Sequence, residues 1–202
     1  MKKIKTWLLN LLIPVQKLLQ QTGEQEALIT HEQVELIKKI IKPGDILLSF
    51  EFGRPTSKLI KGFWDHAAIY TDQSTVMEAV GDKIKAGVNI GGVKEVDLEE
   101  WLYKKDHVAI VRPTYTDDFI NRLASREAMV YKGKGYDYTF SIGSETVYCS
   151  ELVYLCYRQH DKNFMAWVKS DQEILPQDYF DLTLEPARNG MIFNLIFDSR
   201  FE

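Results

Sequence analysis

Apolar and polar residues follow a helical period in the first twenty residues of the chain. The apolar positions fall on one stripe, opposite lysines, Asn10 and glutamines; they are Ile4, Trp7, Leu8, Leu11, Leu12, Val15, Leu18 and Leu19. This pattern predicts an amphipathic helix over residues 1–22, kinked at Pro14. No small-residue cleavage site follows, so no cleavable signal peptide is expected. We expect the helix to dock on its own domain or on a second copy, with peripheral contact at a membrane interface as the alternative.

The pattern from residue 30 onwards predicts one domain that mixes helices and strands. The predicted elements, in chain order, are a helix at 30–41, strands at 45–50, 64–71 and 75–80, a short helix after Asp97 that contains Leu98, Trp101 and Leu102, a strand at 107–112, a long helix at 116–131 capped by Thr116, and an apolar segment at 191–197. No internal repeat divides the chain. The domain is therefore expected to span residues 30–202.

Residues 148–158 (YCSELVYLCYR) predict a mostly buried helix with Cys149 in its first turn. A thiol at that position feels the unpaired N–H groups and the positive end of the helix dipole, which favour the thiolate. Cys149 is therefore a candidate nucleophile, with the role of a small apolar filler as the alternative. Cys156 lies seven residues on, about 10 Å along the helix, so we expect no disulfide between them and place Cys156 in the core.

Two strand-like runs, residues 64–71 and 75–80, predict a hairpin. If the hairpin is centred near Asp72, His66 lies directly opposite Glu78 on one face. A carboxylate on one imidazole nitrogen fixes the tautomer and leaves the other nitrogen to accept a proton from a thiol. The alternatives are an ordinary surface pair, or a slip of one residue that would place the two side chains on opposite faces.

Composition and charge exclude several classes of protein. The chain has 202 residues, of which 45% are hydrophobic, enough for one substantial core. The formal charge is −4 and acidic and basic residues are interleaved, so we expect no nucleic-acid partner. Two cysteines give no disulfide framework, and no run reaches the roughly 20 apolar residues of a membrane span, so a cytoplasmic location, with or without membrane association, is expected. No HExxH, paired CxxC or phosphate-binding glycine loop is present, so no metal or cofactor is predicted.

Several short motifs, in this order, resemble one known family. They are residues 43–48 (PGDILL), a strand bearing His66, residues 77–81 (MEAVG), residues 133–140 (GKGYDYTF) and residues 148–153 (YCSELV). Together they are similar to the YiiX-type permuted members of the NlpC superfamily, which are papain-like cysteine hydrolases. Ordinary members have the cysteine helix before the histidine strand, whereas the permuted group has the order found here. The resemblance covers residues 43–180.

The resemblance implies roles for individual residues. It makes Cys149 the nucleophile, His66 the general base and Glu78 the polar residue that orients the histidine. Tyr136 falls where many relatives have a tyrosine that lines the site, and it would assist the oxyanion beside the backbone N–H of Cys149. This chain departs from the pattern at Gly135, where such relatives often have proline.

The implied fold is α+β, with an antiparallel sheet or small open barrel packed against the cysteine helix, plus N-terminal helices. We expect Tyr136, Tyr138, Trp64 and Phe63 to line an apolar substrate cleft. His107, which opens a predicted strand, is the rival to His66 as the base. His160 lies on the cysteine helix but about 16 Å from Cys149, too far for that role.

The expected function is that of a cysteine amidase or peptidase. The family context makes an amide in a small peptide or in a peptidoglycan-derived molecule the leading substrate. A lipid acyltransferase or thioesterase of the lecithin:retinol acyltransferase type is an alternative, because it uses a similar permuted core and the N-terminal helix would suit membrane substrates. A binding module that keeps the fold without turnover is the third possibility.

Overall fold

The computed structural model describes residues 29–53, 60–81, 84–85, 88–89, 91–115, 118–143, 145–169, 172–185, 187 and 191–201. The amphipathic helix predicted at residues 1–22 lies outside this part of the chain. Its docking or membrane contact therefore stays a prediction. None of the helices in the described part has both the length and the apolar composition needed to cross a bilayer.

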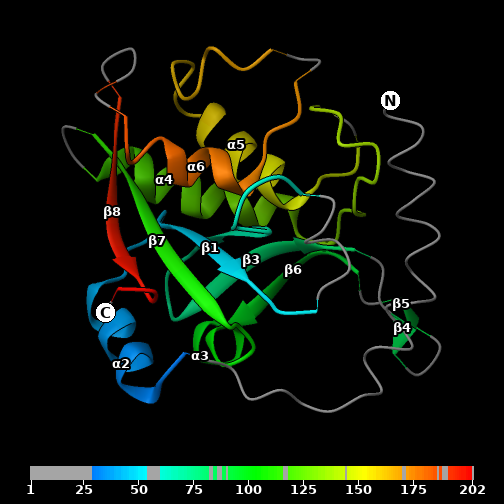
Figure 1. Ribbon diagram of the computed structural model, residues 1–202. Coiled ribbons are helices and arrows are strands. Elements are labelled where there is room, and N and C mark those ends of the chain that lie inside the picture. The colour runs from blue at the N-terminus through cyan, green and yellow to red at the C-terminus, as the bar shows by residue number, and fades with distance from the viewer. Residues whose placement is uncertain are drawn as a thin grey trace.

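A six-stranded antiparallel sheet forms the centre of the domain (Figure 1), with the strand order β6-β3-β2-β1-β7-β8. The strands are β1 (Ile46–Phe50), β2 (His66–Tyr70), β3 (Thr75–Val80), β6 (Gly92–Asp97), β7 (His107–Thr114) and β8 (Ile192–Asp198). A separate two-stranded pair joins β4 (Ile84–Lys85) to β5 (Val88–Asn89). The sequence analysis allows an antiparallel sheet or a small open barrel, and the structure has an open antiparallel sheet.

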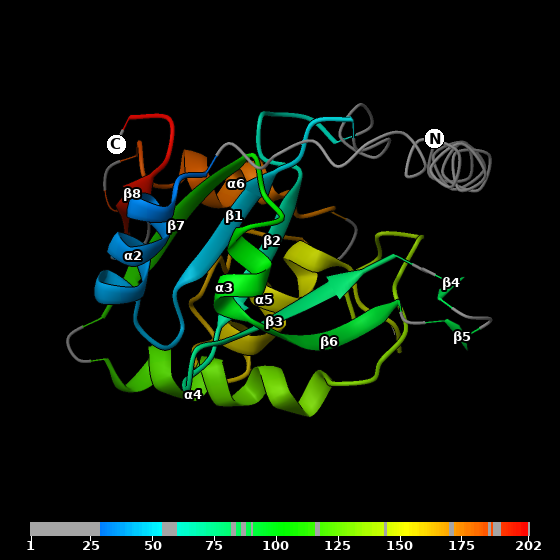
Figure 2. The same cartoon turned by 90° about the horizontal axis from the view of Figure 1, so that it is seen from below.

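Helices cover both faces of this sheet, as Figure 1 and the view from below in Figure 2 show. One face carries α4 (Phe119–Glu127) with the 3₁₀ helix η2 (Ala128–Tyr131), α5 (Cys149–Arg158) and α6 (Pro176–Asp181). The other face carries α2 (His31–Ile40) and α3 (Leu98–Leu102). The α+β fold expected from the sequence is therefore confirmed.

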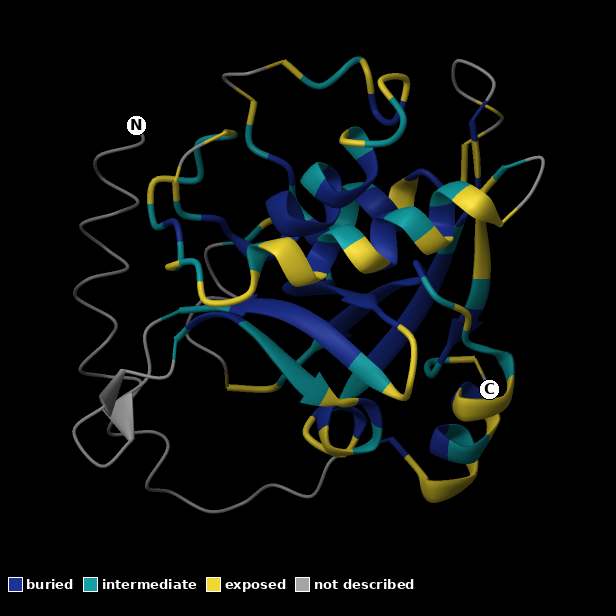
Figure 3. Ribbon diagram, turned by 180° about the vertical axis from the view of Figure 1, so that it is seen from behind, coloured by how far each residue is buried: buried dark blue, intermediate teal, exposed yellow. Residues whose placement is uncertain are grey.

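The central strands are buried on both sides, which explains why they read as continuous apolar runs. Leu48 and Ile69 belong to the core beneath α5, while Leu47 and Ala68 belong to the core beneath α2 and α3. Because strand residues alternate between faces, each strand contributes to both cores. Figure 3 shows the resulting dark-blue sheet between helices whose outer sides are exposed.

Two predicted helix starts are confirmed by their caps. Thr30 caps α2, since its hydroxyl accepts from the backbone N–H of Gln33 and the Gln33 side chain accepts from the N–H of Thr30. Asp97 caps α3 by accepting from the N–H of Glu100 at 3.0 Å. The predicted cap at Thr116 lies outside the described residues, and α4 begins at Phe119.

Gly44, in the turn that leads into β1, is required by both backbone and packing. Its φ is +91°, and a Cβ there would lie 2.4 Å from the backbone oxygen of Asn121 in α4. Gly44→Ala should therefore lower the free energy of unfolding by about 3 kcal/mol or more, measured by urea denaturation. Gly133→Ala is the matched control, because Gly133 has φ +87° but no atom within 4 Å of the added methyl, and should cost only about 1 kcal/mol. Equal losses of unfolding free energy in the two variants would show that the clash with α4 adds nothing to the cost of Gly44→Ala.

Candidate active site

Cys149 is the first residue of α5, as the sequence predicts. The loop before it is fixed by Glu151, whose side chain is fully buried. Glu151 accepts the N–H of Tyr148 at 3.3 Å and the N–H of Gly143 at 2.7 Å. Glu151 thus has a structural role at the start of α5. The N–H of Cys149 lies at the same helix start, where it has no partner within the helix.

The hairpin that carries His66 forms with a register two residues away from the predicted one. Ala68, rather than His66, lies opposite Glu78. The three-residue loop is centred on Gln73 instead of Asp72, and both Gln73 and Ser74 have positive φ. Because a shift of two residues keeps every side chain on its face, His66 and Glu78 still share a face and are diagonal neighbours.

That diagonal brings the two side chains into contact. His66 Nε2 lies 2.8 Å from Glu78 Oε2. An ionised carboxylate only accepts, so Nε2 carries the proton and Nδ1 is left to face another partner. The same carboxylate oxygen accepts the indole N–H of Trp101 at 2.9 Å, and Lys94 Nζ lies 3.5 Å from Glu78 Oε1.

The sheet opens where Cys149 meets it. The pairing of β2 with β3 ends at Ala68 and Glu78, while β3 continues to Val80 as a partner of β6. The N–H of Ala67 is thereby left without a β3 partner, and this N–H helps to lower the pKa of Cys149. His66 is the side chain that does most to lower the pKa of this thiol. The start of α5, on one face of the sheet, can thus approach His66, although Glu78 and Trp101 belong to the other face.

The electrostatics favour a charged sulfur and a charged carboxylate. Cys149, His66 and Glu78 are only 4%, 3% and 5% exposed, so water screens their interactions weakly. Burial alone would raise the pKa of Cys149, but the hydrogen bond and charge of His66, with the Ala67 N–H, lower it below the usual thiol value. Burial likewise opposes ionisation of Glu78, yet His66 and the nearby lysines hold its pKa well below the ordinary range.

The two predicted site tyrosines lie on the loop that precedes α5. The backbone of Tyr136 bridges that of Val147, two residues before Cys149. The rings of Tyr136 and Tyr138 meet edge to face with centroids 5.0 Å apart, and both side chains are half-buried. The hydroxyl of Tyr138 lies beside Gly81 at the end of β3. The expected roles of these tyrosines in binding substrate stay predictions.

Trp64 does not line a cleft, contrary to expectation. Its side chain is fully buried and packs against Phe63 and Phe180, with the guanidinium of Arg200 over its ring at 4.8 Å. Phe180 and Arg200 come from the far end of the chain, so no local pattern around Trp64 indicates its burial. Trp64 is a core residue.

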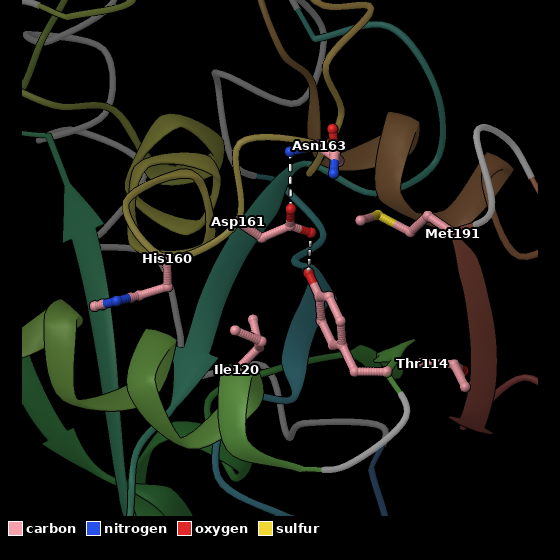
Figure 4. Close-up of a pocket in the computed structure, with 7 residues that line it drawn as sticks. Thr114, Ile120, His160, Asp161, Asn163 and Met191 are labelled. Atoms are coloured by element: carbon pink, nitrogen blue, oxygen red, sulfur yellow. Dashed lines mark hydrogen bonds between the residues drawn. The ribbon is translucent and has the colours of Figure 1, made fainter.

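The remaining histidines and the second cysteine have other surroundings. His107 packs beside Phe63 and has its Nδ1 3.5 Å from the Ser199 hydroxyl. His160 lies 3.3 Å from Glu127 and lines a hollow of about 340 Å³ past the end of α5, where Tyr115, Asp161 and Asn163 are also found (Figure 4). Cys156 is fully buried, as predicted, and burial raises the pKa of its thiol well above the usual value.

Sequence reasoning missed the groups that surround Glu78. The sequence pattern identifies Trp101 only as an apolar member of a short helix, and it assigns no role to Lys94 or Lys105. Lys94 lies directly opposite Glu78 on β6, a pairing that requires knowledge of which strands are neighbours. The one local indication is the residue type of Trp101, because a buried indole usually needs a hydrogen-bond acceptor for its N–H.

Glu151 should give the protein a pH-dependent stability. Burial raises its pKa to about 7, although the N–H groups of Gly143 and Tyr148 lower it in part. An unfolded carboxyl titrates near 4.5, so between pH 4.5 and pH 7 the folded state holds a proton that the unfolded state has lost. Stability should fall over this interval, by about 3 kcal/mol from this group. Urea denaturation of wild type and Glu151→Gln at both ends of the interval measures the difference; equal slopes would contradict the assignment.

Comparisons with known proteins show the family and the fold of this chain. The family model described as permuted papain-like amidase enzyme, YaeF/YiiX, C92 family, matches residues 40–180. A crystal structure of the metalloprotein YiiX from Escherichia coli O157:H7 is similar, with a TM-score of 0.54 and 20% sequence identity over 70% of this chain and 93% of that one. No curated protein sequence matches the chain.

The similar structure from Escherichia coli is described as that of a metalloprotein. In the described part of the chain, no three His, Cys, Asp or Glu side chains are arranged to hold a metal ion.

Proposed function

Because the chain belongs to the YaeF/YiiX family of permuted papain-like amidases, we propose that it hydrolyses an amide bond through a thioester on Cys149. The observation that carries the proposal is the position of His66. Its imidazole lies 2.8 Å from the carboxylate of Glu78, and it is the main group that lowers the pKa of Cys149. A nucleophile, a base and a group that orients the base are the parts that covalent hydrolysis needs.

The reaction then proceeds in two halves. The Cys149 thiolate attacks the amide carbonyl, the S–C bond forms, and the carbonyl oxygen becomes an oxyanion. Collapse of this intermediate breaks the C–N bond, and the leaving amine takes a proton from the His66 imidazolium. A water molecule, deprotonated by His66, then attacks the thioester and releases the carboxylic acid with return of the thiolate. Glu78 holds the imidazole ring in place and stabilises its charge.

The start of α5 supplies stabilisation for the oxyanion. The N–H of Cys149 has no partner within the helix, and the helix dipole adds positive potential at that point. Tyr136, on the loop that runs beside Val147, is the side chain that we assign as a second donor. Tyr138, whose ring meets that of Tyr136, is assigned to the apolar wall of the cleft.

The substrate that we propose is an amide in a small peptide or in a peptidoglycan-derived fragment. The test incubates the protein with a panel of dipeptides and soluble peptidoglycan fragments and measures released amine. A parallel sample receives phospholipid vesicles and an acyl acceptor. Amine release supports the proposal. Acyl transfer without amine release would assign the acyltransferase chemistry instead, and alkylation of Cys149 with no turnover in either sample would leave a binding module.

A further inference from the structure

We propose that Trp101 is a positioning residue for the site. It holds the carboxylate of Glu78, and Lys105 supports it from the other side. The inference rests on the proposed function of Cys149, His66 and Glu78 and deepens it. Trp101 touches no reacting atom. It acts through Glu78, whose carboxylate it holds in the position from which that carboxylate orients His66.

The contact that carries the inference is a shared acceptor atom. Glu78 Oε2 lies 2.8 Å from His66 Nε2 and 2.9 Å from Trp101 Nε1. The indole has one donor and no acceptor, so this N–H is committed to Glu78. Trp101 is 1% exposed and is packed by α3 into the core beneath that helix, so its ring has little freedom to move. A rigid donor therefore fixes the oxygen that the histidine uses.

A buried lysine supports the indole from its face. Lys105 is 5% exposed, its ammonium lies 4.8 Å from the centroid of the Trp101 ring, and its other partner is the carboxylate of Glu51. A cation on the ring face is attracted by the π-electrons and draws electron density from the indole, which strengthens the N–H as a donor. The charge of Lys105 also acts on Glu78 directly.

The charged groups that face Glu78 come from three elements. They are His66 on β2, Lys94 on β6 at 3.5 Å from Oε1, and Lys105 just after α3. Lys94 is more than one-third exposed, so solvent screens its charge, whereas Trp101 and Lys105 are buried. The buried pair is thus the stronger support for the ionised carboxylate. Without the N–H of Trp101, Glu78 would take up a proton at higher pH and would be free to turn away from His66.

The experiment removes this N–H while keeping an aromatic ring. In Trp101→Phe we expect kcat to fall about tenfold with KM changed less than about twofold, because one hydrogen bond to a charged group is lost. The acid limb of the pH profile for iodoacetamide alkylation of Cys149 should move to higher pH. Replacement of Trp101 by benzothienylalanine, which keeps the shape of indole but has sulfur for the N–H, should give the same shift without a packing defect.

Two matched variants set the scale. Trp64→Phe is the control, because Trp64 is equally buried but its N–H has no hydrogen-bond partner among the described residues. It should lower stability without moving the alkylation profile. Glu78→Gln sets the upper limit, and its shift should have the same sign as that of Trp101→Phe and exceed it.

The experiment distinguishes a failure of the proposed function from a failure of the role proposed for Trp101. If wild-type Cys149 shows no alkylation at pH values below the ordinary thiol range, the proposed function fails. If wild type shows it, and Trp101→Phe and the benzothienylalanine variant retain the wild-type acid limb and kcat, Trp101 is a packing residue only and this inference is overturned.

Discussion

Cys149→Ala should abolish hydrolysis, with kcat/KM lower by at least about 10⁴-fold, because the atom that forms the acyl-enzyme is gone. The loss should appear in kcat, since a methyl group in place of the thiol leaves the surrounding side chains in place. The measurement is amine release from whichever amide the wild-type protein cleaves best.

Cys156→Ala is the matched control, seven residues along the same helix. Its thiol is fully buried and burial raises its pKa, so it has neither the access nor the charge of a nucleophile. The variant should lose stability by a cavity effect and keep its activity once folded. Activity that survives in Cys149→Ala and disappears in Cys156→Ala would reverse the assignment.

His66→Ala has the second largest expected effect. The imidazole is the main group that lowers the pKa of Cys149 against the cost of burial. Without it, the sulfur should be protonated at neutral pH and the leaving amine should have no proton donor, so kcat/KM should fall by about 10³-fold or more. The remaining activity should rise with pH up to the new thiol pKa, and a pH profile of kcat/KM measures this.

His107→Ala provides the comparison for His66→Ala. His107 was the rival base on sequence grounds, but it lies against Phe63 and Ser199. Its removal should leave the pH profile of kcat/KM unchanged. A loss of activity in His107→Ala as large as that in His66→Ala would mean that the wrong histidine has been assigned.

The cysteine helix could be predicted because its signals are local. Apolar residues at helical spacing define α5, and the residues before Cys149 end the preceding loop within a few positions of it. A thiol at a helix start needs no distant partner to be recognised as a candidate. The same holds for the caps of α2 and α3, where the capping residue lies within three positions of the group it binds.

The hairpin was predicted on the correct face with the wrong pairs. Its register depends on Gln73 and Ser74, which adopt positive φ although neither is glycine, and no residue type announces that geometry. The prediction that His66 and Glu78 share a face is still correct, because the predicted register differs from the observed one by an even number of residues. An error of one would have separated them.

The parts of the site that escaped prediction depend on distant segments. The N–H of Trp101 finds Glu78 only after α3 folds under the sheet, and Trp64 is covered by Phe180 and Arg200 from the end of the chain. The free N–H of Ala67 exists because β3 leaves β2 to follow β6. Each of these is a property of tertiary packing and has no local pattern.

If the imidazole of His66 keeps the sulfur of Cys149 anionic, titration of the thiolate will show it. The ultraviolet absorbance of the thiolate, followed with pH in wild type and in Cys149→Ala, gives the signal of this sulfur by difference. We expect most of the signal to be present well below the ordinary thiol pKa of about 8.5, and we expect His66→Ala to move the transition to higher pH. A single transition at or above 8.5 in wild type, unchanged in His66→Ala, would contradict it.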